Sequence, residues 1–223
     1  MGKPPILRQV GFRMTALAFM ATLMLISGCT TGSRATADAF RLLGKDQVEV
    51  SSTQVADNPY PQALLKAPDL SSLLILGFVD EGGQTWLAGR LAAYKLDDSG
   101  LVIGMSGSHR EIQVRIVGES PFQNLAAIHG STRVQREYDW LPGYRMGIQV
   151  QSTLVRGKLE SVEILGVKHA LIRFDEWMEG GMSAHNVYWV DPTNGFIWKS
   201  RQQLSPNYVI ELVQLKPYRA SKD

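Results

Sequence analysis

The sequence predicts a mainly β protein: a single domain built on a strongly curved antiparallel sheet or an open barrel, with a minor helix near its N-terminus. Apolar and polar residues alternate along several segments, and clusters of Gly, Pro, Asp and Asn separate those segments. Neither an internal repeat nor a second linker divides the 223-residue chain. Because successive side chains of a strand point to opposite faces, this alternation is typical of strands with one buried face.

The expected strands follow from this period in order along the chain. Leu73–Val79 comes first and is apolar at every position, so we expect a strand buried on both faces there. Every second residue is apolar in segments 111–117, 144–151 and 169–174. These three segments are expected to be strands with one face toward the core.

Turn residues separate the strands. We predict turns at Asp80–Gly83, Asp97–Gly100, Arg156–Gly157 and Asp191–Gly195. Glycine supplies the positive φ that tight turns need, proline presets φ, and Asp or Asn side chains cap the turn backbone. Because short turns join strands that are neighbours in the sheet, an antiparallel meander is expected.

The first 28 residues have the pattern of an export signal. They contain three basic residues and no acidic one, and an apolar stretch covers residues 14–26. A basic start, an apolar segment of this length and small residues before a cleavage site indicate a secretory signal. The tetrapeptide Ile26–Cys29 is a lipobox, so we expect cleavage before Cys29 and a diacylglycerol on its thiol. Two or three acyl chains make a firm anchor, since each buried CH₂ contributes about 0.8 kcal/mol.

Three segments follow from this signal: the lipoprotein signal peptide at 1–28, the lipidated cysteine and a tether at 29–45, and a β-rich domain at 46–223. A short helix is expected at 37–43, before a glycine. Thr30, next to the anchor, is not the aspartate that retains many lipoproteins at the inner membrane, and therefore favours the outer membrane. The protein is expected to face the periplasm there.

The charge balance excludes a nucleic-acid partner. The signal holds three of the 23 basic residues, so the chain after it carries 20 basic and 21 acidic residues. Such a balance offers no electrostatic attraction for a phosphate backbone. Cys29 is the only cysteine, and its acylation leaves no thiol for a disulfide.

No local motif of catalysis, metal binding or nucleotide binding occurs in the sequence. The four histidines stand far apart without the spacing of a zinc site, and we expect no metal and no cofactor. The carboxylates Asp175, Glu176 and Glu179 are the candidates for a polysaccharide hydrolase or lyase. Asp175 and Glu176 are instead interpreted as solvated charges at the end of a strand, with side chains on opposite faces.

The tryptophans are candidate ligand-surface residues, because flat aromatic faces stack on sugar rings when they are exposed. Most of the five are expected in the core of a β domain without disulfides, which leaves one or two as exposed platforms. The candidates are Trp86, Trp140, Trp177, Trp189 and Trp198.

Several motifs in order resemble those of one family. Asn186–Asp191 reads Asn-Val-Tyr-Trp-Val-Asp and precedes Gly195–Ile197, and the chain upstream contains Asn58–Tyr60, Gly83–Trp86 and Trp140–Pro142. In these features the chain resembles the GfcB/YjbF lipoproteins of group 4 capsule and other exopolysaccharide operons. The resemblance covers residues 40–215, and the loop 175–184 has no counterpart in it. It implies a β-rich fold, a helper role in polysaccharide export or assembly, and no catalytic or metal-binding residues.

Two functions from different classes remain open. The first is a lipid-anchored, non-catalytic accessory in capsule or exopolysaccharide secretion, with polysaccharide-export proteins as partners and the polysaccharide as a further candidate ligand. The alternative is a periplasmic lipid or lipoprotein carrier with a concave β-surface, which the hairpin at Asp191–Gly195 also fits. A continuous apolar concavity distinguishes the carrier from the accessory protein.

Overall fold

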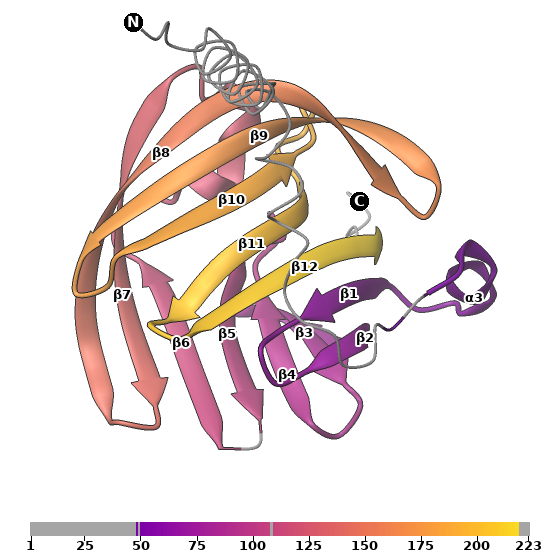
Figure 1. Ribbon diagram of the computed structural model, residues 1–223, viewed down its shortest axis with the longest axis horizontal. Helices are drawn as coiled ribbons and strands as arrows, with labels where there is room; N and C mark the ends of the chain where they lie inside the picture. The colour runs from indigo at the N-terminus through magenta and orange to yellow at the C-terminus, as the bar shows by residue number, and fades with distance from the viewer. Residues whose placement is uncertain (1–47, 49, 108, 219–223) are drawn as a thin grey trace, which may run out of the picture. The chain divides into compact units, whose positions relative to one another are not determined.

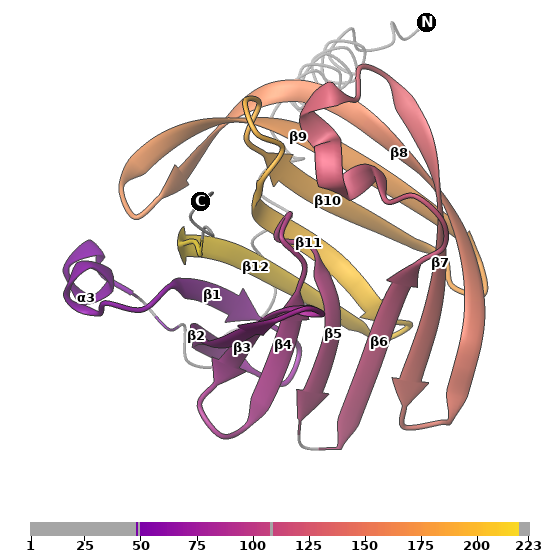
Figure 2. The same cartoon turned by 180° about the vertical axis from the view of Figure 1, so that it is seen from behind.

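Twelve antiparallel strands form a closed barrel within residues 46–223, which make one compact unit. The computed structural model describes residues 48, 50–107 and 109–218. The signal peptide, Cys29 and the predicted helix at 37–43 lie outside this part. Figure 1 shows the barrel with α3 at one side, and Figure 2 shows η2 just before the start of β7.

The elements follow one another along the chain with short connections. They are α3 (Ser52–Asp57), β1 (Gln62–Lys66), β2 (Ser71–Asp80), β3 (Gly83–Ala88), β4 (Ala92–Leu96), β5 (Val102–Gly107), β6 (Arg110–Ile116), the 3-10 helix η2 (Pro121–Ala127), β7 (Ser131–Leu141), β8 (Arg145–Ile164), β9 (Val167–Gly180), β10 (Ala184–Val190), β11 (Ile197–Ser205) and β12 (Tyr208–Lys216).

Each strand pairs with the next one along the chain, and β1 pairs with β12 to close the barrel. The predicted mainly β, antiparallel meander is therefore confirmed, and the sheet is closed. Closure gives every strand a partner on both sides over part of its length, and the β8–β9 hairpin extends beyond its pairing with β7 and β10. Among the described residues, no helix is long and apolar enough to cross a membrane.

Side-chain caps fold three of the four predicted turns. The Asp97 carboxylate accepts hydrogen bonds from the backbone N–H groups of Ser99 and Leu101, both at 3.0 Å. Asp191 caps its turn in the same way, and Gly195 closes it with a φ of 75°. The prediction at Arg156–Gly157 is wrong, because both residues lie inside β8, at a shift in its register with β9. Glycine fits there because a Cβ on Gly157 would lie 2.9 Å from the carbonyl oxygen of Arg173.

The strand predictions hold where one face points into the barrel. In β6, Ile112 and Val114 are buried and their neighbours in sequence are exposed. The prediction of two buried faces for Leu73–Val79 is wrong: Leu74 is buried, whereas Phe78 and Val79 are 55% and 44% exposed. These apolar side chains lie near the end of β2, beyond a shift in its register with β3.

The barrel interior contains two apolar clusters. One includes Trp86, Tyr94 and Leu212, and the other includes Phe122 of η2 and Phe174 of β9. Burial of such side chains is the main source of stability for a domain without disulfides. Polar residues separate the two clusters, and they are described with the site below.

Candidate functional site

The structure separates the five candidate tryptophans into two groups. Trp86 is fully buried, and Trp140 packs against the same apolar cluster, so these two belong to the core. Trp177, Trp189 and Trp198 lie on the neighbouring strands β9, β10 and β11. The prediction that most of the tryptophans lie in the core is wrong, because only two of the five do. The expectation of one or two exposed platforms fits Trp177, which is 54% exposed.

Trp177 projects from the outside of the barrel, because Glu176 and Met178 on either side of it point inward and are buried. Its ring stacks on the imidazole of His185 in β10, with centroids 3.8 Å apart and planes 2° from parallel. His185 Nε2 lies 2.7 Å from Asp175 Oδ1. Arg173 donates two hydrogen bonds to the same carboxylate, at 2.9 and 2.7 Å. We call Arg173, Asp175, Trp177 and His185 the Trp177 site.

The Trp177 site is held in place by charge as well as by stacking. Partial burial raises the pKa of Asp175, but the hydrogen bonds from Arg173 and His185 lower it more, so the pKa lies below its usual range. A bidentate guanidinium fixes the orientation of a carboxylate. Arg173 therefore orients the Asp175 carboxylate, and this carboxylate orients the His185 imidazole. The Trp177 indole stacks on that imidazole and is held in place by it.

Trp189 lies beside this site on the outer face of β10, opposite Arg173 in the register with β9. Its indole Nε1 donates to Glu160 Oε2 at 2.7 Å. Two cations approach its ring: Arg173 at 5.9 Å and Lys199 at 4.8 Å from the centroid. Burial lowers the pKa of Lys199. Trp189 thus serves mainly as a packing surface for charged side chains.

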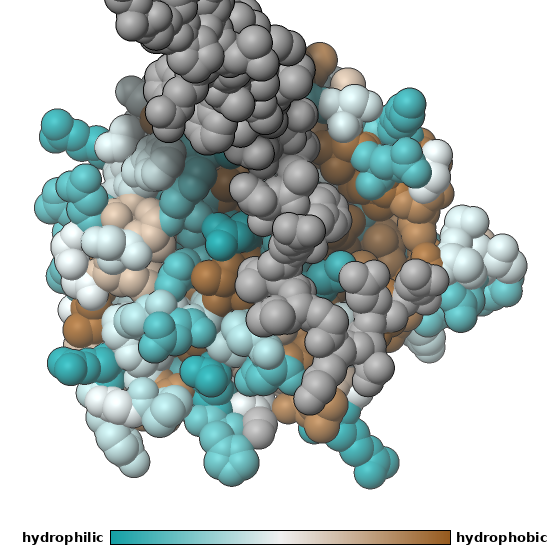
Figure 3. Space-filling model, in the orientation of Figure 1, coloured by the Kyte–Doolittle hydropathy of each residue, from teal (hydrophilic) through white to brown (hydrophobic). Residues whose placement is uncertain are grey.

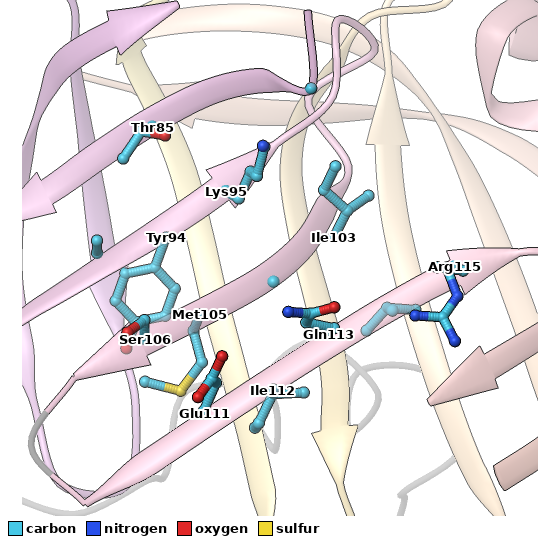
Figure 4. A pocket seen from close by; sticks show the side chains of 14 residues that line it. Thr85, Tyr94, Lys95, Ile103, Met105, Ser106, Glu111, Ile112, Gln113 and Arg115 are labelled. Carbon is cyan, nitrogen blue, oxygen red and sulfur yellow. The ribbon is translucent and has the colours of Figure 1, made fainter. Parts of the chain in front are cut away.

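A groove of about 380 Å³ lies over β3–β6. Gly104 lies within its lining, between Lys95 of β4 and Gln113 of β6 in the register of the sheet. Because Gly104 has no side chain, the groove is open at this position, and a Cβ would partly fill it. Figure 4 shows Lys95, Ser106 and Gln113 on neighbouring strands around this room.

Glu176, the carboxylate next to Asp175 in the sequence, lies inside the barrel and is fully buried. Arg136 of β7 binds it with two hydrogen bonds, at 2.8 and 3.0 Å. Ser152, Tyr188 and Asn186 donate three more, at 2.6, 2.7 and 3.0 Å. We call these five residues the interior polar cluster.

The ionised form of Glu176 is strongly favoured. Burial alone raises the pKa of Glu176, but the Arg136 guanidinium and the hydrogen-bond donors bring it below its usual range. Burial, together with the Glu176 carboxylate, raises the pKa of the Tyr188 hydroxyl well above its usual range. A buried charge pair of this kind is stable only when further hydrogen bonds satisfy its remaining groups, and here Ser152, Asn186 and Tyr188 do so.

This geometry corrects the interpretation of the carboxylates. Asp175 and Glu176 lie in the middle of β9, not at its end, and Glu176 is not solvated. Their side chains do point to opposite faces, as predicted. β9 continues to Gly180, so the segment 175–184 is mostly strand and not a loop. Since Glu176 is enclosed and paired, the trio with Asp175 and Glu179 cannot act together on a polymer.

The interior polar cluster also interrupts the apolar lining that a lipid carrier needs. Along β9 the inward side chains run from Phe174 in one apolar cluster through Glu176 to Met178 in the other. Along β7 the corresponding polar residue is Arg136. An acyl chain that passed through this region would have to lie against a buried ion pair, which is unfavourable. The continuous apolar concavity that would mark a carrier is therefore missing from this part of the barrel.

Sequence reasoning missed Arg136, Ser152 and His185. Arg136 had a usable signal, since it alternates in phase with Val134 and Tyr138 and must point inward with them. No such signal connects these residues to one another, because they come from β7, β8 and β10. In the described part of the chain, no group of His, Cys, Asp and Glu side chains comes together to hold a metal ion.

Figure 3 shows mostly hydrophilic residues with scattered apolar ones on the left of the view, and a larger apolar area toward α3.

The fold is that of a known structure. The lipoprotein YmcC from Escherichia coli K12 superposes with a TM-score of 0.65 at 22% identity, over 77% of this chain and all of that one.

Comparison of sequences gives the family. The lipoprotein GfcB of Escherichia coli K12 is 24% identical over 215 residues, which are 92% of this chain and 99% of that protein. A family model described as group 4 capsule polysaccharide lipoprotein GfcB, YjbF matches residues 34–215. Because this match covers most of its length, the chain belongs to the GfcB/YjbF family of capsule polysaccharide lipoproteins.

Proposed function

We propose that this protein is a lipid-anchored accessory of the bacterial envelope that assists the secretion or assembly of a capsule or exopolysaccharide, without catalysing a reaction. Family membership over residues 34–215 carries the proposal. The lipobox ending in Cys29 supports an anchor, and Thr30 supports the outer membrane, facing the periplasm. The enclosed state of Glu176 supports a role in binding, because it removes one of the three carboxylates considered for catalysis.

The proposal is tested by deleting the gene in the bacterium that carries it and measuring surface polysaccharide under conditions that induce its synthesis. We expect a large loss of polymer at the surface, and recovery when the wild-type gene is returned. An unchanged yield of polymer in the deletion strain would contradict the proposal.

The anchor has a separate test. In Cys29→Ser, the thiol that takes the lipid is absent, so we expect the protein to leave the membrane fraction. Mass spectrometry of the wild-type protein should show an acylated N-terminal cysteine, and density fractionation should place it with the outer membrane. A wild-type protein with an intact N-terminus and no lipid would contradict the anchor alone.

The carrier remains the second class of function, but the interior polar cluster does not favour it. Extraction of the purified protein with organic solvent provides the check. Acyl chains recovered in amounts equal to the protein, beyond those on Cys29, would favour the carrier over the accessory.

A further inference from the structure

We propose that a chain of neutral sugar residues binds along the outside of the barrel, from the Trp177 site on β9 to the groove at Gly104 on β5. The inference rests on the proposed function, because a polysaccharide is the ligand class that this function supplies. It goes further in placing the polymer on one face and in assigning its contacts.

The Trp177 site offers a prepared aromatic platform. The Trp177 ring is 54% exposed, and His185 stacks on one of its faces. His185 is tied to Asp175, which Arg173 binds with two hydrogen bonds. A side chain that is already ordered loses little conformational entropy when a ligand stacks on it. An indole exposed at such a supported position marks a binding surface rather than a packing residue.

The surroundings of Trp177 distinguish a sugar from a protein as its ligand. Thr153 of β8 lies directly opposite Trp177, and Arg133 of β7 lies opposite Thr153. Gln151 and Glu179 form the adjacent pair, and all four side chains are exposed. A protein hot spot lies in a well-packed pocket that is fully desolvated in the complex, and such interface cores are poor in charged residues. A sugar ring, in contrast, has an apolar face and a rim of hydroxyl groups, which matches an indole among hydroxyl, amide and guanidinium groups.

Polar side chains continue from this platform to the groove across four strands. Gln151 of β8 pairs with Gln135 of β7. One step further along β8, Gln149 donates to Glu137 at 2.7 Å, and Glu137 is bound by Arg115 of β6. Neighbouring strands lie about 4.8 Å apart, so the four steps from β9 to β5 cover about 19 Å. This path exceeds a single sugar ring and suits several linked ones.

The groove provides the other end of the path. Its volume of about 380 Å³ lies within the usual range for small-molecule sites. Gln113 of β6 contributes an exposed amide beside Gly104, and Ser106 contributes an exposed hydroxyl. Together with Lys95 they present donors and acceptors around a hollow, as binding of sugar hydroxyl groups requires.

The charges along the path favour neutral sugars. Arg173 is paired with Asp175, Arg115 with Glu137 and Asp139, and Lys95 with Asp80 at 3.5 Å. Each of these three cations therefore has a carboxylate beside it, and the exposed Arg133 and Glu179 add one charge of each sign, so the path has no field of one sign. A strongly anionic polymer would meet these carboxylates, whereas hydroxyl groups can bind to both partners of each pair.

The test measures binding of the purified surface polysaccharide of the producing bacterium to the full mature lipoprotein in detergent. The polymer is used intact and as fragments of increasing length, with tryptophan fluorescence and calorimetry as readouts. We expect Trp177→Ala to weaken binding about tenfold, as the loss of one aromatic stacking contact predicts. Ser106→Leu, which fills the groove, should weaken binding less, and fragments shorter than the path should bind less tightly than the polymer.

Tyr144→Ala is the matched control, since Tyr144 is 86% exposed and lies outside the path, in the turn between β7 and β8. It should bind the polymer like the wild type, and thermal unfolding should show all three variants folded. Equal binding by Trp177→Ala and the wild type would overturn the proposal, as would equal affinity for the shortest fragments and the intact polymer.

The outcome also separates this inference from the proposed function. If gene deletion abolishes surface polymer but the wild-type protein binds no polysaccharide, the accessory role holds and the sugar path is wrong. If Trp177→Ala then still reduces surface polymer, the Trp177 site docks a protein instead, which equally overturns the inference.

Discussion

Two adjacent carboxylates on β9 have opposite environments. Asp175 faces outward, and Glu176 faces into the barrel. Each is bound by an arginine through two hydrogen bonds, Arg173 outside and Arg136 inside. The outer pair is partly solvated, so breaking it has a small effect on folding. The inner pair is enclosed, so removing one partner leaves a buried charge without compensation. The inner face therefore supports the fold, and the outer face is free to bind.

The largest effect should come from Arg136→Met. The Glu176 carboxylate then stays in the barrel interior without its cation, and we expect a loss of about 3–5 kcal/mol in the free energy of unfolding. Urea denaturation measures it. The double variant Arg136→Met/Glu176→Leu removes both charges and should recover much of this stability. A double variant no more stable than the single one would contradict the assignment of the loss to the uncompensated Glu176 carboxylate.

Tyr188→Phe should have an intermediate effect. It removes the hydroxyl that donates to Glu176 at 2.7 Å and accepts from Arg136 at 3.2 Å. The loss of a bond to a buried charged group predicts about 1–3 kcal/mol, measured in the same way. Tyr138→Phe is the control, because its hydroxyl lies beside Arg136 but donates to the weak acceptor Met178 Sδ, at 4.0 Å, and not to Glu176. Equal losses in both variants would contradict the special role of Tyr188.

Asp175→Asn should cost no more than about 1 kcal/mol, because the outer pair is partly exposed. Its signature is the dependence on pH. The pKa of Asp175 in the folded protein is below its ordinary value of 3.8. The ionised carboxylate therefore makes its full contribution to the free energy of unfolding at pH values above 3.8. This contribution is lost as the pH falls through the lower, folded-state pKa. When the free energy of unfolding is measured from neutral pH down through this range, it should fall less steeply in Asp175→Asn than in the wild type. Parallel curves would contradict the coupling to Arg173 and His185.

Trp177→Ala should change stability least, by about 0.5 kcal/mol, as is usual for a surface position. Trp86→Ala is its counterpart inside the barrel, where Trp86 is fully buried; we expect a loss of about 3–5 kcal/mol there. Thermal or urea unfolding of both variants measures the contrast. A large loss in Trp177→Ala would show that this indole supports the fold and would remove the reason to regard it as a binding platform.

Prediction from the sequence succeeded where a local rule decides the structure. Alternation along β6 predicted its buried face, and the carboxylates of Asp97 and Asp191 predicted their turns. It failed where a distant element decides. The apolar residues of Leu73–Val79 do not reveal that Phe78 and Val79 are left exposed on β2.

The candidate site shows the same division. Trp86 and Trp177 each lie in a strand with alternating burial, yet one belongs to the core and the other to the surface. The choice depends on which face of each strand points inward. The stack of Trp177 on His185 depends further on the register between β9 and β10.

The sequence by itself determined the β class, the order of strands and most of the turns, because these depend on the period of apolar residues and on turn chemistry within a few residues. It also carries the lipobox at Cys29 and the motifs of the family. Only the tertiary structure decided that the sheet closes and that Glu176 meets Arg136 inside it. Those outcomes depend on the pairing of β1 with β12 and on the register of β7 through β10, which bring together residues that no local pattern connects.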